Sequence, residues 1–160
     1  MVVPAKSGLT NILKTKIGQV PQACLAAFST NRGALTRTAG QIHFYNGATD
    51  KGNLYMFYNP SQYALPQYSF QNVNANTTAN ATTLLGANGP PSPNVVVWSN
   101  FWSQNLAGQA QTLWHELTHV YTKQGDLQLD QRFNINTGPF GGPGFGASSA
   151  YDAWLANDCH

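Results

Sequence analysis

The chain has 160 residues, of which 42% are hydrophobic and only 9% are charged, and its net charge is +2. The charged share lies far below the roughly 25% usual for globular proteins. Because Lys and Arg form no cluster and no run approaches the roughly 20 apolar residues of a membrane span, composition argues against nucleic-acid and membrane partners. The length fits one domain, so we expect residues 1–160 to form a single unit that acts as a monomer.

The predicted elements begin with a short helix over 20–29, in which Pro21 suits the first turn. Aromatic and β-branched residues then predict strands over 34–46 and 53–58, and a third strand over 94–99. Between the second and third strands, the Asn/Thr-rich and Pro-rich sequence predicts a long polar loop over 71–93.

The clearest helix signal in the sequence covers 101–123, where apolar residues recur at spacings of three and four. Gly125 is placed to end this helix. The segment 137–149 is too rich in glycine for regular structure, and a final helix is predicted over 148–159, with Ser148 or Ser149 as its N-cap.

The stretch "WHELTHVY" lies inside the predicted helix and contains His-Glu-x-x-His. Residues four apart share a helix face, so His115 and His119 can present two imidazole nitrogens to one zinc ion. Glu116, the only glutamate of the chain, can then act as general base without binding the ion. Shuffling this composition would produce the motif roughly 0.0006 times per chain, so chance explains it poorly.

The third protein ligand of such a site must be an aspartate or a distant histidine, because no second glutamate exists. His43 precedes the motif and His160 is the last residue, whereas Asp126 and Asp130 follow the helix closely. A chain that turns at Gly125 can bring either carboxylate to the metal. The residues alone leave both aspartates open.

Together these features resemble the aspzincins, the deuterolysin-like fungal zinc endopeptidases, which combine His-Glu-x-x-His with a downstream Asp ligand. Asp130 follows His119 by 11 residues, similar to the family spacing, and "SAYDAWLAN" is similar to the family's terminal helix. The resemblance implies one zinc ion per chain on His115, His119 and Asp130, with Asp126 as the alternative ligand. It covers roughly 113–157 and is firm only at the motif itself.

Two departures from the family pattern affect the expected site. The Gly-Thr pair is missing before Asp130, and Phe133 stands where the family has a tyrosine. Tyr151 is therefore a candidate to stabilise an oxyanion in its place. Asp152 is a candidate either to orient a metal-binding histidine through its other N–H or to cap the last helix.

Features outside the motif favour an oxidising, extracellular location. Cys24 and Cys159 are predicted to form one disulfide that ties distant parts of the chain together. Asn76 and Asn80 each begin a glycosylation sequon. We therefore expect a secreted protein.

The expected fold is α+β and zincin-like, with a small, mostly antiparallel sheet packed on the metal-bearing helix. The expected function is that of a zinc metalloendopeptidase, which hydrolyses internal bonds of protein or peptide substrates held along a sheet edge. Two alternatives are a secreted zinc-binding effector with little turnover and a zinc hydrolase acting on another bond, such as a cell-wall amide.

Overall fold

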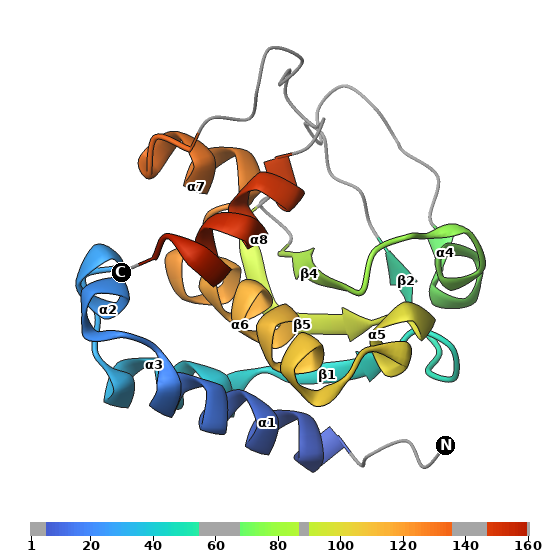
Figure 1. Cartoon of the computed structure of the whole chain (residues 1–160). Coiled ribbons are helices and arrows are strands. Elements are labelled where there is room, and N and C mark those ends of the chain that lie inside the picture. Colours follow the sequence, from blue (N-terminus) through green and yellow to red (C-terminus); the bar gives the residue numbers. More distant parts are fainter. Residues whose placement is uncertain (1–5, 55–67, 87–89, 136–146, 160) are drawn as a thin grey trace.

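The computed structural model describes residues 6–54, 68–86, 90–135 and 147–159. In these ranges helices surround a small sheet, so the α+β part of the prediction is confirmed (Figure 1). Most of the predicted strand over 53–58 and of the glycine-rich segment over 137–149 lies outside the described residues.

The main sheet has three described strands: β1 (His43–Asn46), β5 (Pro91–Val97) and β4 (Ala81–Leu85), in the order β1-β5-β4. β5 pairs in parallel with β1 and antiparallel with β4, so this sheet is mixed rather than mostly antiparallel. A separate antiparallel pair joins β2 (Asn53–Leu54) to β3 (Tyr68–Ser69). Within the described residues β4 is an edge strand of the main sheet.

The two faces of β5 belong to different hydrophobic clusters, because successive side chains of a strand point to opposite sides. Val95 and Val97 enter the main core beneath the long helix α6 (Leu106–Thr122). Val96 enters a second cluster on the other face, with Phe70 at the start of α4. The sheet is therefore covered on both faces.

Helix α6 crosses the centre of the molecule (Figure 1), and every residue from Leu113 to Val120 is buried. The single helix predicted over 101–123 is divided into α5 (Ser99–Ser103) and α6. The division falls before Asn105. The side chain of this residue accepts a hydrogen bond from the Gly108 N–H and so acts as the N-cap of α6. The His-Glu-x-x-His motif lies entirely within α6.

The amino-terminal region is more helical than predicted. Helix α2 (Gln22–Ala27) confirms the expected helix, but α1 (Lys6–Gln19) was not predicted. The strand predicted over 34–46 is wrong in its first part, which forms α3 (Arg32–Gln41) before β1 begins. Asn31 caps α3 by accepting a hydrogen bond from the Ala34 N–H, and this local signal outweighs the β-branched composition.

The long loop predicted over 71–93 is also wrong, because this segment contains α4 (Phe70–Asn76), β4 and the start of β5. Ser69 caps α4 by accepting from the Asn72 N–H. β4 then gains its backbone partners from β5, which a reading of local sequence cannot supply.

Two helices follow α6 and bring further side chains to it: α7 (Asp126–Arg132) and α8 (Ala147–Asn157). Helix α8 confirms the predicted final helix, although Ser148 and Ser149 lie inside its first turn. Helix α7 was not predicted. Lys123 adopts the left-handed conformation with φ 59° at the end of α6, and this residue, rather than Gly125, ends the helix.

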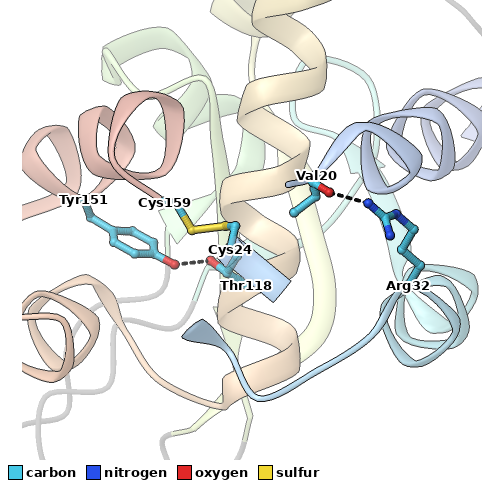
Figure 2. The surroundings of a disulfide bond; sticks show 6 residues. All are labelled: Val20, Cys24, Arg32, Thr118, Tyr151 and Cys159. Atoms are coloured by element: carbon cyan, nitrogen blue, oxygen red, sulfur yellow. Dashed lines mark hydrogen bonds between the residues drawn. A yellow bond between two sulfur atoms is a disulfide. The ribbon is translucent and has the colours of Figure 1, made fainter. Parts of the chain in front are cut away.

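A disulfide joins Cys24 of α2 to Cys159, which follows α8, as predicted (Figure 2). The two cysteines are 135 residues apart and both are buried in the main core. The bond therefore fixes the end of α8 against the amino-terminal helices. None of the described helices is long and apolar enough to cross a lipid bilayer.

Candidate metal centre

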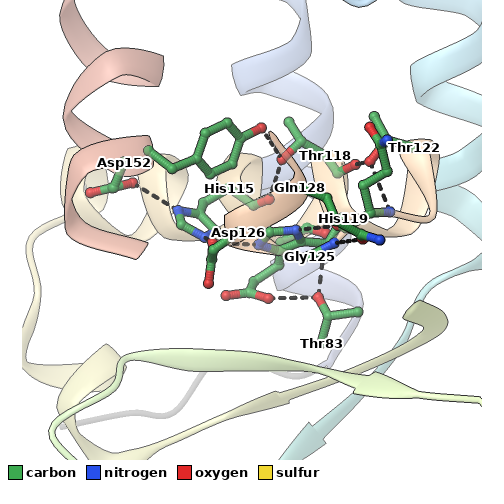
Figure 3. A network of polar contacts seen from close by, with 12 residues as sticks. Thr83, His115, Thr118, His119, Thr122, Gly125, Asp126, Gln128 and Asp152 are labelled. Carbon is green, nitrogen blue, oxygen red and sulfur yellow. Dashed lines mark hydrogen bonds and ion pairs between the residues drawn. The ribbon is translucent and has the colours of Figure 1, made fainter. Parts of the chain in front are cut away.

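Two imidazoles and one carboxylate converge beside α6 (Figure 3). The Nε2 atoms of His115 and His119 each lie 3.0 Å from Oδ1 of Asp126. The histidines share one face of α6 because they are four residues apart. Asp126 reaches them because the chain reverses at Lys123 and starts α7 one residue after Gly125.

The other nitrogen of each imidazole faces an acceptor. His115 Nδ1 lies 3.3 Å from Asp152 Oδ1, and His119 Nδ1 lies 2.7 Å from the carbonyl oxygen of Gln124. A neutral imidazole that donates from Nδ1 carries its lone pair on Nε2, the atom directed at Asp126. Asp152 lies inside α8 rather than at its start, so of the two roles considered for it the contact with His115 is the one that its position allows.

This arrangement fits a metal ion. The ligand atoms of His115, His119 and Asp126 all lie within 4.8 Å of one another, so the three residues could hold a metal ion. Ligand atoms of a tetrahedral zinc site are about 3.3 Å apart, since each bond is about 2.0 Å long. The observed 3.0 Å spacings are therefore only a few tenths of an ångström too short.

Asp130, the ligand that the family resemblance implies, is not part of this group. It lies one turn after Asp126 on α7, only 2% exposed, and neither of its carboxylate oxygens has a hydrogen-bond partner among the described residues. Burial and the negative charge of Asp126 raise its pKa to about 6. The structure thus assembles the group with the alternative aspartate, Asp126.

The charges of the group are strongly coupled. Burial disfavours protonation of His115, but hydrogen bonds to Asp126 and Asp152 outweigh it and raise the pKa of His115 to about 10. Burial likewise disfavours the Asp126 carboxylate, but its hydrogen bonds to His115 and His119 outweigh that effect and hold its pKa well below the usual range. When no cation is bound, these contacts therefore favour a protonated His115 at neutral pH.

We expect metal binding to displace this proton. Because the His115 pKa is raised to about 10, the metal-free site holds the proton at pH 7 and loses it only above that pKa. Zinc affinity should therefore rise with pH between 7 and 9, by up to about tenfold per unit. Calorimetric titration with zinc in buffers of different ionisation enthalpy measures the released proton directly.

His43 provides the control for this titration, because it is exposed and lies in β1, outside the site. Proton release should be unchanged in His43→Ala. A binding enthalpy independent of the buffer, or an affinity that does not change with pH, would contradict the prediction.

Glu116 lies between two pockets beside the group. One pocket has a volume of about 380 Å³ and is lined by Asn80, Thr112 and Asp152, among others. The second, of about 340 Å³, is lined by Thr83, Leu85 and Asp126, among others. Both pockets are bounded by His115 and Glu116 and by residues of β4, so together they form a cleft between the edge strand and α6.

Tyr151, a candidate for oxyanion stabilisation, packs against the imidazoles. Its ring centroid lies 5.1 Å from that of His115 and 5.8 Å from that of His119. Its buried hydroxyl donates to Thr118 Oγ1 at 2.7 Å (Figure 2), and burial raises the pKa of the phenol. In this arrangement the ring supports the histidines, while the hydroxyl is engaged away from the cleft.

The two sequon asparagines differ in position. Asn76 is exposed at the end of α4, where its amide donates to the carbonyl of Asn72. Asn80 is half-buried and lines the larger pocket. Nothing in the sequence marked Asn80 as a residue of the pocket that Glu116 also lines, because β4, which begins directly after it, was not predicted.

Two further contacts of the site were not predicted from the sequence. The hydroxyl of Thr83 donates to Glu116 Oε2 at 2.6 Å, and the carbonyl oxygen of Gln124 faces Nδ1 of His119. A threonine 33 residues away from the motif carries no local signal. The Gln124 carbonyl acts through its backbone, which the residue type does not reveal.

Comparison of the chain with protein-family models, curated proteins and solved structures found no match.

Proposed function

We propose that the protein is a secreted zinc metalloendopeptidase with a zincin-like active site. One observation carries the proposal: two imidazole Nε2 atoms and a carboxylate oxygen meet at one point, and Glu116 lies beside them in an open cleft. A structural zinc site is normally closed by four protein ligands, whereas a catalytic site keeps a position open. Three ligands facing a cleft fit the catalytic type.

Zinc is the ion that the donors favour. Two neutral imidazoles with one carboxylate suit zinc, while calcium and magnesium prefer sites made of oxygen atoms alone. The Nδ1 acceptors Asp152 and Gln124 O would keep both histidines in the tautomer that binds through Nε2. When bound, zinc supplies Lewis-acid chemistry, which polarises a carbonyl oxygen and makes water more acidic.

The protein's own groups would then carry the proton. Glu116 would accept a proton from the attacking water as the new C–O bond forms, and would donate it to the leaving nitrogen as the C–N bond breaks. Glu116 is only 7% exposed, so little bulk water competes for its carboxylate. The edge strand β4 borders the cleft, where an extended peptide could pair with its backbone.

The proposal is tested by removing and restoring the metal. The zinc-loaded protein should cleave denatured protein substrates, lose that activity when a chelator removes the ion, and regain it with about one equivalent of zinc per chain. Internal cleavage products identified by mass spectrometry would establish an endopeptidase. Activity on a cell-wall amide polymer alone, or zinc binding without any hydrolysis, would contradict the proposal.

A further inference from the structure

Thr83, which Figure 3 labels below the candidate site, belongs to the edge strand β4, and its hydroxyl contacts the proposed general base. It lies 2.6 Å from Glu116 Oε2, a distance typical of a hydroxyl donating to a carboxylate. The same hydroxyl also lies 3.4 Å from the carbonyl oxygen of Glu116, so it is close to both the backbone and the side chain of that residue. The much shorter contact identifies the carboxylate as the acceptor.

Glu116 is buried, but few polar contacts hold its carboxylate. Within the described parts of the chain, the Thr83 hydroxyl is the only hydrogen-bond donor to its carboxylate. A glutamate has three rotatable side-chain bonds, so packing of the chain alone leaves the direction of its terminal carboxylate less defined than a hydrogen bond does. A single charge-assisted hydrogen bond is enough to favour one of them.

Thr83 is well suited to hold the carboxylate still. Its backbone lies opposite Val95 of β5, and the pairing register shifts between Thr83 and Leu85. Such an irregularity bends a strand and changes the direction of its side chains, and it often occurs beside active sites. Threonine is branched at Cβ, so its χ1 angle is restricted and its hydroxyl has a defined direction.

We propose that Thr83 is a positioning residue for the base: it binds Oε2 of Glu116 and leaves the other carboxylate oxygen free to take the proton of the attacking water. This inference rests on the proposed function. Thr83 keeps its own proton throughout the reaction, while Glu116 alone receives and returns the transferred proton. Because Thr83 belongs to β4, the base is held by the same strand that borders the substrate cleft.

Two variants of the zinc-loaded protein separate the hydroxyl from the shape of the side chain. Thr83→Val removes the hydroxyl but keeps the branched shape that suits a strand, and Thr83→Ser keeps the hydroxyl. We expect Thr83→Val to lower kcat by roughly 10- to 100-fold with KM nearly unchanged, and Thr83→Ser to stay within about threefold of wild type. Zinc content and melting temperature should be preserved in both variants.

Thr15→Val is the matched control, because Thr15 is exposed on α1 and has no part in the cleft. Its kcat should equal that of the wild type. The inference is overturned if Thr83→Val keeps full kcat, changes only KM or loses zinc, or if Thr83→Ser is as impaired as Thr83→Val. If the wild type itself shows no zinc-dependent hydrolysis, the proposed function fails, which is a distinct result.

Discussion

Glu116→Gln is expected to lower kcat by about 10²–10⁴-fold, the range typical of losing a general base. Glutamine has nearly the same shape, and its carbonyl oxygen can still accept the hydrogen bond from Thr83. It cannot accept a proton from water at neutral pH. Since Glu116 does not belong to the three-residue group, the variant should retain one zinc ion per chain.

The measurement compares kcat, zinc content and melting temperature with those of Asp158→Asn. That control also removes one negative charge, but from an exposed residue that follows α8. A Glu116→Gln protein that hydrolyses peptides at the wild-type rate would refute the assignment of the base. A biological effect that survives the loss of turnover would instead favour the zinc-binding effector.

Asp126→Ala is expected to have the largest effect on metal binding. Removing a partner of a metal-bound histidine typically costs 10–100-fold in affinity, and removing a ligand should cost more than about 100-fold. Without Asp126, the two imidazoles also lose the carboxylate that faces both Nε2 atoms. Elemental analysis after dialysis should find little zinc in this variant.

Asp130→Asn is the matched comparison, because Asp130 lies on the same short helix but outside the three-residue group. Its buried carboxylate has no hydrogen-bond partner among the described residues, so replacing it removes a charge that is costly to bury. Zinc should remain bound. Selective loss of zinc in Asp130→Asn, with retention in Asp126→Ala, would reverse the assignment and favour the family spacing.

The parts of the site that were predictable from sequence are those fixed by one helix. The spacing of His115 and His119 places both imidazoles on one face of any helix that contains them. The pattern correctly predicted a helix over the motif, although that helix begins at Leu106 and not at residue 101. The choice between Asp126 and Asp130 depends instead on where α7 begins. The start of α7 follows from the left-handed conformation of Lys123. This conformation is typical of glycine, so a lysine at that position gave no indication of it.

The strands were harder to predict because their stability comes from distant partners. The polar residues of β4 read as a loop, yet they pair with the apolar β5 and bring Thr83 over Glu116. Conversely, the β-branched residues around α3 suggested a strand, whereas Leu35 and Ala39 are buried on one helical face. Strand propensity reflects packing against neighbours more than any property of the isolated segment.

The position of α8 in the chain has a consequence for biosynthesis. During translation α6 and α7 emerge before α8, so both histidines and Asp126 exist before Asp152 and Tyr151 can dock against them. The disulfide cannot form until Cys159 has left the ribosome and met Cys24. A nascent chain that lacks α8 therefore presents the two histidines and Asp126 without the contacts of Asp152 and Tyr151, which can form only after α8 has been synthesised.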